Sequence, residues 1–280
     1  MRYVRKNDAE YPSVLSRYER MPAGLYVRGD LPDGGKKSAA IVGARACSEY
    51  GRAEARRFAR VLASAGVQVI SGMALGIDSE AHEGALEAGG RTFAVLGSGA
   101  DVCYPYSKER LYKRIIENGG VLSELEPGTP ALAYHFPIRN RIISALSDVV
   151  IIVEARKRSG SLITADYALE QNKTIYALPG RVRDSLSEGT NDLICQGAVP
   201  ALSPEQILRD LGILGEQTVK RSSLSSAEKR ILKAVSSAPK SLEMIAEETG
   251  LGIAVLSRLI PGLLLKDLIG ETISGRYLLK

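Results

Sequence analysis

The stretch that decides the fold is YHFPIRNRIISALSDVVIIVEARKRSGSLITADYALE, residues 134–170. Near its start, the segment Phe136-Pro137-Ile138-Arg139-Asn140-Arg141 predicts the beginning of a helix that carries two guanidinium groups and an amide. The apolar run from Val149 to Val153 is typical of a buried parallel strand, and it ends in Glu154. A helix followed by such a strand is part of an α/β unit.

Three basic residues, Arg156, Lys157 and Arg158, follow the strand, and the turn Ser159-Gly160-Ser161 comes after them. We expect the next helix to begin at Thr164. Groups that bind anions are therefore placed at two successive turns of one unit. No acid–base pair accompanies them, so the stretch favours binding of a phosphate backbone over catalysis.

Short apolar runs alternate with helical patterns over most of the chain. Strands are predicted at residues 39–42, 67–70, 92–96, 121–123 and 174–178, and helices at 50–65, 78–88, 108–117, 137–146 and 190–196. This alternation, with short glycine-rich connections, predicts an α/β fold with a Rossmann-like, mostly parallel sheet and helices on both faces. Ligands of such sheets bind at the carboxyl ends of the strands, where the glycine-rich and arginine-bearing turns of this chain fall.

Four segments are predicted along the chain. Residues 1–37 are an N-terminal extension in which Leu25-Tyr26-Val27 can add a short strand, and residues 38–214 are the sheet domain. Residues 215–224 are a linker with little apolar content. Residues 225–280 combine three short helices, the third interrupted at Pro261, with a hairpin that turns at Ser274-Gly275. Three helices and such a hairpin predict a small winged-helix domain.

Composition narrows the class of protein only partly. The chain has 280 residues, a net charge of +5 and a pI near 9.0, a basic balance that permits nucleic-acid binding without indicating it. Cys47, Cys103 and Cys195 form no CxxC pair, so neither a disulfide framework nor a zinc site is expected. With two histidines in the whole chain, we expect no metal and no other cofactor. We see no signal peptide or membrane-spanning segment, so the predicted location is the cytoplasm.

The glycine-rich turns do not match a dinucleotide site. The first turn reads Gly43-Ala44-Arg45, and after the third strand Gly97-Ser98-Gly99 is followed by Val102 where a third glycine is required. Arg45 instead points a cation at any ligand over the sheet edge. The turn from Ser71 to Asp78, with Asp78 expected to cap the next helix, predicts a concave set of backbone N–H donors for an anionic oxygen. A plain tight turn is the alternative.

Two further patterns leave alternatives open. Aromatic residues, among them Tyr104, Tyr134 and Phe136, flank basic positions, an arrangement suited to base stacking and phosphate pairing with single-stranded nucleic acid. The same rings can equally pack in the core. Asp78 and His82 are four residues apart on one helix face, as a catalytic dyad or as a cap and a hydrogen-bonded core histidine.

Together these residues resemble the DprA/Smf family, the DNA-processing proteins of natural transformation. The match covers roughly residues 10–280. Its motifs, in chain order, are Leu25-Tyr26-Val27-Arg28-Gly29, Val42-Gly43-Ala44-Arg45, Ser71-Gly72-Met73-Ala74, Gly97-Ser98-Gly99, Tyr104-Pro105, Phe136-Pro137 through Ile143, Ser159-Gly160-Ser161-Leu162-Ile163-Thr164 and Leu178-Pro179-Gly180.

The resemblance implies a protein without catalytic activity that binds single-stranded DNA on an extended Rossmann domain. It also implies that the protein forms a homodimer and loads a RecA-type recombinase onto the DNA. The expected DNA-binding residues are Arg45, Ser48, Gly72, Met73, Lys108, Phe136, Arg139, Asn140, Arg141, Ser159, Gly160 and Ser161. Some members have a lysine where this chain has Ala133, so one phosphate contact is expected to be absent or relocated. Many members carry a helical N-terminal module, which we expect to be missing or trimmed here.

Two other functions remain open. One is a nucleotide-processing enzyme of the lysine-decarboxylase-like (phosphoribohydrolase) type, whose P-G-G-x-G-T-x-x-E signature is not matched by the turn at residues 159–164. The other is a transcription factor that acts through the winged helix, although residues 253–260 offer only Ser257 and Arg258 as polar groups, which favours a protein-contact role. In the DNA-binding interpretation, Glu154 is a structural counter-ion of an arginine.

Overall fold

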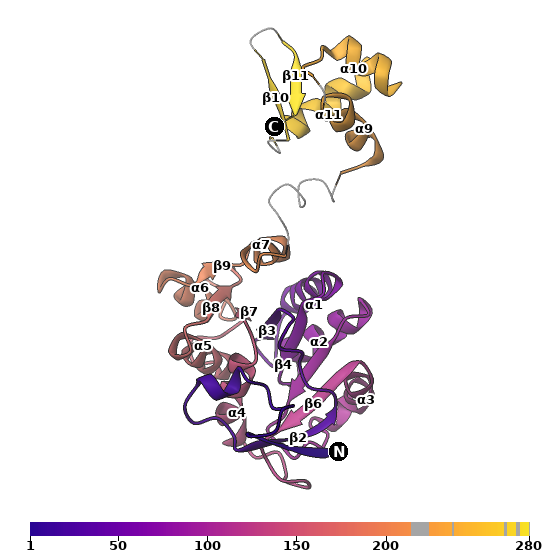
Figure 1. Cartoon of the computed structure of the whole chain (residues 1–280). Helices are drawn as coiled ribbons and strands as arrows, with labels where there is room; N and C mark the ends of the chain where they lie inside the picture. Colours follow the sequence, from indigo (N-terminus) through magenta and orange to yellow (C-terminus); the bar gives the residue numbers. More distant parts are fainter. Residues whose placement is uncertain (214–223, 237, 266–267, 273–274, 280) are drawn as a thin grey trace. The chain divides into compact units, whose positions relative to one another are not determined.

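The structure is a computed structural model that describes residues 1–213, 224–236, 238–265, 268–272 and 275–279. The chain divides into two compact units, Met1–Ile213 and Leu214–Lys280 (Figure 1). The predicted linker, residues 215–224, lies outside the described residues except for Leu224. Residues 1–37 belong to the first unit, so no division between compact units falls at the boundary predicted at residue 37.

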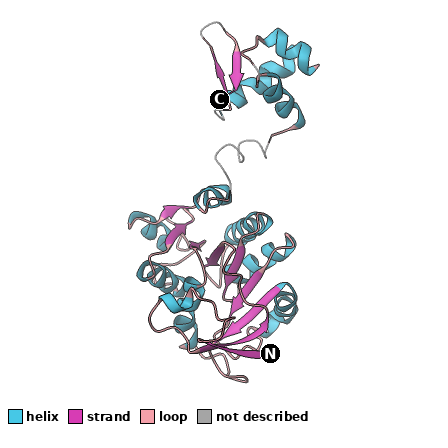
Figure 2. Ribbon diagram, viewed as in Figure 1, coloured by secondary structure: helices cyan, strands magenta, loops and turns pink. Residues whose placement is uncertain are grey.

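Nine strands of the described residues form one sheet in the first unit, in the order β1-β2-β6-β5-β4-β3-β7-β8-β9. Figure 2 shows strands of this unit in magenta and the helices around them in cyan. The run from β6 to β9 is parallel throughout. In sheet order, these parallel strands are β6 (Gly119–Ser123), β5 (Thr92–Val95), β4 (Gln68–Ser71), β3 (Ser38–Val42), β7 (Val149–Ile152), β8 (Thr174–Ala177) and β9 (Val199–Pro200). The predicted mostly parallel α/β sheet is confirmed.

The N-terminal segment extends the sheet at the β6 end. β2 (Gly24–Gly29) runs antiparallel to β6, and β1 (Arg2–Arg5) runs antiparallel to β2. The short strand predicted around Leu25 is therefore β2, whereas β1 was not predicted. Leu15, in the 3₁₀ helix η1 (Leu15–Arg17), is fully buried and packs in the core cluster of α4 and the sheet.

Helices cover both faces of the sheet (Figure 1). The chain moves outward from β3 to β6 and then crosses back to β7, so right-handed connections place the two sets of helices on opposite faces. One set is α1 (Glu49–Ser64), α2 (Ile77–Glu87) and α3 (Glu109–Asn118), and the other includes α4 (His135–Ala145) and α5 (Gly160–Glu170). The unit ends with α6 (Glu188–Cys195) and the unpredicted α7 (Pro204–Asp210).

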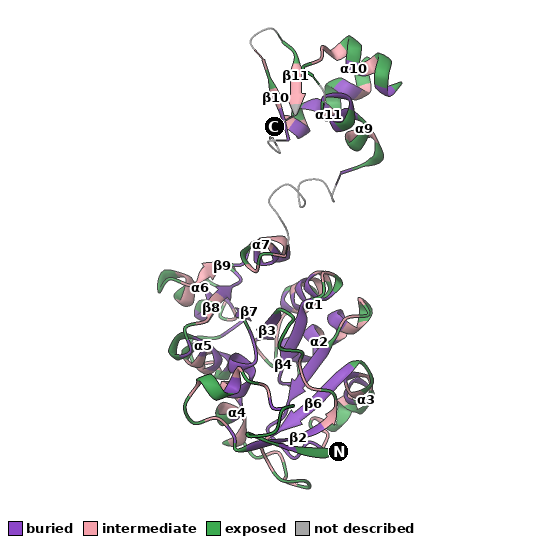
Figure 3. Ribbon diagram, in the orientation of Figure 1, coloured by how far each residue is buried: buried purple, intermediate pink, exposed green. Residues whose placement is uncertain are grey.

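The central strands are buried on both faces, as their continuous apolar sequences predict (Figure 3). Because the core is closed on both sides, side chains that bind a ligand are left to the loops at the strand ends. No helix of the described residues is long and apolar enough to cross a membrane.

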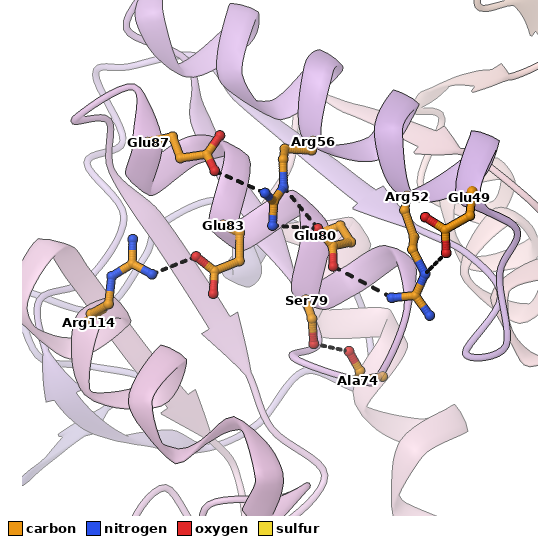
Figure 4. A network of polar contacts seen from close by, with 9 residues as sticks. All are labelled: Glu49, Arg52, Arg56, Ala74, Ser79, Glu80, Glu83, Glu87 and Arg114. Carbon is orange, nitrogen blue, oxygen red and sulfur yellow. Dashed lines mark hydrogen bonds and ion pairs between the residues drawn. The ribbon is translucent and has the colours of Figure 1, made fainter.

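Much of the basic charge on α1 is used in ion pairs with α2 (Figure 4). Arg56 Nη2 lies 2.8 Å from Glu80 Oε2, and Arg52 Nη1 lies 3.7 Å from Glu80 Oε1. Arg114 of α3 pairs with Glu83 at 2.5 Å in the same way. These arginines hold three helices together, so they contribute little free positive charge for an anionic partner.

The described residues of the second unit form three helices and a two-stranded antiparallel sheet. These elements are α9 (Ser226–Ala234), α10 (Leu242–Thr249), α11 (Ile253–Leu265), β10 (Ile269–Glu271) and β11 (Tyr277–Leu279). α11 continues through Pro261, so the predicted interruption there is wrong, because proline removes one backbone donor without ending this helix. The turn residue Ser274 lies outside the described residues, and the winged helix stays a prediction.

Candidate functional site

A pocket of about 260 Å³ lies at the carboxyl ends of the parallel strands. It is at the topological switch point, because β3 lies between β4 on one side and β7 on the other, where α/β sheets bind ligands. Four connections contribute to its lining: Gly43 and Arg45 after β3, Ala74 and Asp78 after β4, Ala133, Phe136, Pro137, Arg139 and Asn140 around the start of α4, and Ser159, Gly160, Ser161 and Thr164 at the start of α5. We call this cavity the switch-point pocket.

Arg45 is the exposed cation of the switch-point pocket. Its guanidinium carbon lies 4.7 Å from the centroid of the Phe136 ring, which positions the charge while leaving its N–H groups available. Arg45 forms no ion pair with any described residue. The Tyr104 ring lies 5.6 Å from Phe136, and Gly97 packs so closely that an added Cβ would be 2.9 Å from the Phe136 ring.

Arg139 lies beneath the pocket and is only 4% exposed. Its Nη1 donates a hydrogen bond to the carbonyl oxygen of Gly72 at 2.9 Å and another to the carbonyl oxygen of Val95. Burial lowers the pKa of Arg139 to about 10, so the guanidinium remains charged at neutral pH. The Nη1 group of Arg139 thus serves the ends of β4 and β5, and the direct phosphate contact predicted for this residue stays a prediction. Arg139 therefore places a buried positive charge beneath the switch-point pocket.

The turn after β4 already holds an anion from the chain itself. The prediction that Asp78 caps α2 is wrong. The helix begins at Ile77, and its N-cap is Gly76, whose φ is +78°. The carboxylate of Asp78 accepts the Gly72 N–H at 3.2 Å, so this turn is not an open site for an external anion. Burial raises the pKa of Asp78, and nearby Arg139 opposes the shift. Met73 is fully buried, so its side chain has no surface to offer DNA.

The start of α5 is the open anion-binding group of the pocket. The helix begins at Gly160, four residues before the predicted Thr164, because Ser159 is its N-cap and accepts the Ser161 N–H at 3.4 Å. Gly160 is exposed, and an added Cβ there would meet nothing within 4 Å. The partial positive charge of the helix start therefore faces free space beside Arg45.

The two residues after Arg139 have different surroundings. Asn140 lines the pocket, and its Nδ2 donates to the Gly160 carbonyl at 3.3 Å, which ties α4 to the start of α5. Arg141 lies outside the pocket lining and pairs with Glu124 at 2.5 Å. The prediction grouped three consecutive residues into one site, but only Arg139 and Asn140 line the pocket, and Arg141 does not.

Other predicted residues also lie outside the switch-point pocket. Lys108 is in the 3₁₀ helix η2 (Tyr106–Lys108) before α3. The Ser48 N–H donates to Glu154 at 2.9 Å, and the Ser48 hydroxyl donates to the same carboxylate. Glu154 is thus held at the start of α1, and the interpretation as an arginine counter-ion is wrong, since no arginine pairs with it among the described residues.

Comparison with known proteins identifies the family. A family model described as "DNA recombination-mediator protein A" matches residues 2–212. The chain belongs to this family. Protein Smf of Escherichia coli is 46% identical over 202 residues, which are 72% of this chain and 54% of that protein. DNA processing protein DprA of Streptococcus pneumoniae is 42% identical over 200 residues, 71% of both chains. The chain spans about half the length of the Escherichia coli relative.

Two solved structures of DNA processing protein A share the fold. The X-ray structure of the Streptococcus pneumoniae protein has a TM-score of 0.69 at 39% identity and covers 74% of this chain and 73% of that one. The Helicobacter pylori protein, described for its single-stranded DNA binding mode, has a TM-score of 0.67 at 31% identity and covers 75% and 96% of the two chains.

Sequence reasoning missed some contributions to the switch-point pocket of this family member. Thr164 lines the pocket from within α5. Asp78 also lines it, and its carboxylate is hydrogen-bonded to the Gly72 N–H instead of capping α2. His82 is fully buried and contacts Thr92 Oγ1 at 2.7 Å, so its prediction as a core histidine is confirmed. The helical spacing of Gly160 to Thr164 was the available signal for Thr164, since residues four apart share a helix face.

Proposed function

We propose that this chain binds single-stranded DNA at the switch-point pocket and does so largely independently of base sequence. The observation that carries the proposal is the exposed Arg45, stacked on Phe136 and facing the open start of α5. A guanidinium and a helix start both bind phosphate, and an aromatic ring stacks with any base.

Independence of base sequence is supported by how the polar side chains of the pocket are used. Asn140 is bonded to Gly160 and to Arg139, and Asp78 is bonded to the turn after β4. These two side chains, which could otherwise bind base edges, are thus already hydrogen-bonded within the protein. The remaining binding energy comes from phosphates and ring faces, which all nucleotides share.

We further propose that the protein acts as a homodimer that loads a RecA-type recombinase onto bound DNA, in the cytoplasm. The family supports this role. Self-association is supported by exposed apolar residues at the β8–β9 end of the sheet, where Leu169 of α5 is 71% exposed and Leu202 after β9 is 70% exposed. The three free cysteines are consistent with a reducing compartment.

The alternative is a nucleotide-processing enzyme, and we propose that the chain is not one. Such an enzyme needs a catalytic acid at the site. Glu154, the acidic residue at the end of β7, is held at the start of α1 and does not line the pocket. Asp78, the acidic residue that does line the pocket, is 6% exposed and bonded to the backbone. Incubation with nucleoside monophosphates tests this proposal, since release of free base would establish the enzyme instead.

The DNA-binding proposal is tested by fluorescence anisotropy with oligo-dT and with duplex DNA over a range of salt concentrations. Arg45→Ala should weaken oligo-dT binding by about 1–3 kcal/mol, the worth of a charge-assisted hydrogen bond. Arg60→Ala, which removes an exposed arginine from the body of α1, is the matched control. Equal oligo-dT affinity of the Arg45→Ala variant and the wild type at moderate salt would show that the pocket is not the DNA site.

A further inference from the structure

A second cavity lies at the carboxyl edge of the same sheet. It has a volume of about 630 Å³ and is lined by Ser48 and Tyr50 at the start of α1 and by Pro179, Gly180, Arg181, Asp184 and Ser187 after β8. We call it the β8 groove. Ser48, predicted as a DNA contact, lies here rather than in the switch-point pocket.

The wall of the β8 groove is held in place by hydrogen bonds from a side chain and from the backbone. Asn191 of α6 accepts the Gly180 N–H at 3.2 Å and donates to the Gly180 carbonyl at 3.2 Å. Leu186 O accepts the Ala155 N–H at 2.8 Å, which joins the loop to the end of β7. The groove is therefore preformed, and little conformational entropy would be lost when a ligand enters it.

Two side chains of the groove are suited to a nucleotide. Tyr50 is 54% exposed and packs against no other aromatic ring of the described residues. Arg181 is exposed and forms no ion pair with them. The acidic residue of the groove, Asp184, accepts the Leu186 N–H at 3.0 Å, so one of its oxygens is hydrogen-bonded within the loop. An aromatic face beside a free guanidinium is the combination that binds single strands by stacking and phosphate pairing.

The order of the strands connects the two cavities. β7 lies between β3 and β8, so the ends of β3 and β8 are about 10 Å apart at the usual strand spacing. The segment that leaves β7 carries Arg156, Lys157 and Arg158, all exposed and all without an ion pair among the described residues. A polyanion that leaves the switch-point pocket toward β8 would pass these basic residues before it reaches Tyr50 and Arg181.

We propose that the β8 groove is a second nucleotide subsite that holds the continuation of the DNA strand from the switch-point pocket. This inference rests on the proposed function. The first pocket then holds short oligonucleotides by itself, and the β8 groove adds affinity only for strands long enough to reach it.

The test is anisotropy of the full chain with oligo-dT of increasing length. Tyr50→Ala should weaken binding of long oligo-dT by about five-fold, the lower end for loss of one stacked base, and leave the shortest bound oligonucleotide unaffected. Tyr50→Phe, which keeps the ring, should restore the affinity. Arg181→Ala should reduce the slope of log K against log salt by about 0.7 for long strands, as for one lost phosphate contact.

The controls separate failure of this inference from failure of the proposed function. Arg45→Ala should weaken oligonucleotides of every length, whereas Arg60→Ala, about 16 Å along α1 from the helix start, should change neither affinity nor slope. If Arg45→Ala weakens binding while Tyr50→Ala and Arg181→Ala leave long-strand affinity and salt slope unchanged, the β8 groove is not a subsite. If the wild-type chain does not bind oligo-dT at all, the proposed function itself fails and the inference fails with it.

Discussion

Replacing Arg139 by alanine should destabilise the protein far more than replacing Arg45, although both arginines line the same pocket. Arg139 is 4% exposed, and its guanidinium bonds two buried carbonyl oxygens, those of Gly72 and Val95. Arg45 is exposed and lies over a ring. The two substitutions therefore separate a residue that supports the pocket from one that we propose contacts DNA.

The magnitude follows from the contacts. A hydrogen bond to a charged group contributes about 1.5–3 kcal/mol, and removing one partner of a buried charged pair costs about 3–5 kcal/mol because the other is left unpaired. Arg139→Ala leaves two carbonyls without a donor and the Asp78 carboxylate without its neighbouring cation. We expect the free energy of unfolding to fall by about 3–5 kcal/mol, against less than about 0.5 kcal/mol for Arg45→Ala.

Urea unfolding followed by far-UV circular dichroism measures this difference, with oligo-dT anisotropy on the same samples. Arg139→Lys is the matched variant, and it should be intermediate because an ammonium keeps the charge but lacks the planar guanidinium, in which Nη1 donates to both carbonyls while Nε donates to Asn140. If Arg139→Ala has the same urea midpoint of unfolding as the wild type and loses only DNA affinity, the structural role assigned to Arg139 is refuted. A direct contact with DNA is then favoured.

Three further outcomes are expected. Ala133→Lys adds a cation to the pocket wall, so it should tighten oligo-dT binding and steepen the salt slope by about 0.7, whereas Ala133→Gln should not; an unchanged slope would count against the wall position. Gly97→Ala forces a Cβ to within 2.9 Å of the Phe136 ring, so binding should weaken at a stability cost of about 1–3 kcal/mol; wild-type affinity would contradict the stacking role of the ring. Burial lowers the pKa of His82 from 6.5 to about 3. The unfolded chain therefore takes up a proton first as pH falls below 6.5, and stability should drop by about 2 kcal/mol between pH 7 and 5, a drop that His82→Gln should remove in urea titrations at both pH values. An equal pH dependence of the variant would show that His82 is not responsible.

Local sequence was sufficient for the fold because its signals are short in range. Continuous apolar runs such as Val149 to Val153 are typical of strands buried on both faces, and they recur with glycine turns at the right intervals. The same turns carry the family's motifs. The terminal strands β1 and β9 and helix α7 were missed because they are short and are stabilised by pairing with distant segments.

The site was predicted in its residue types but not in its geometry. In the motif Arg139-Asn140-Arg141, Arg139 is buried beneath the pocket, Asn140 lines it with an amide, and Arg141 forms an ion pair outside it. Rotation of about 100° per helical residue separates them, and spacing along the chain does not reveal which of the three faces the ligand.

By itself, the sequence determined the alternation of strands and helices, the family and the edge of the sheet where a ligand binds. Only the tertiary structure decided which anion-binding groups at that edge are available. Asp78 occupies the turn after β4, and Glu154 occupies the start of α1, so the start of α5 and Arg45 are left open to a phosphate. The physical reason is that a backbone N–H donates to whichever oxygen folding brings within reach. Glu154 reaches the start of α1 from the end of β7, and the carboxylate of Asp78 folds back onto the turn that carries it, and spacing along the chain shows neither contact.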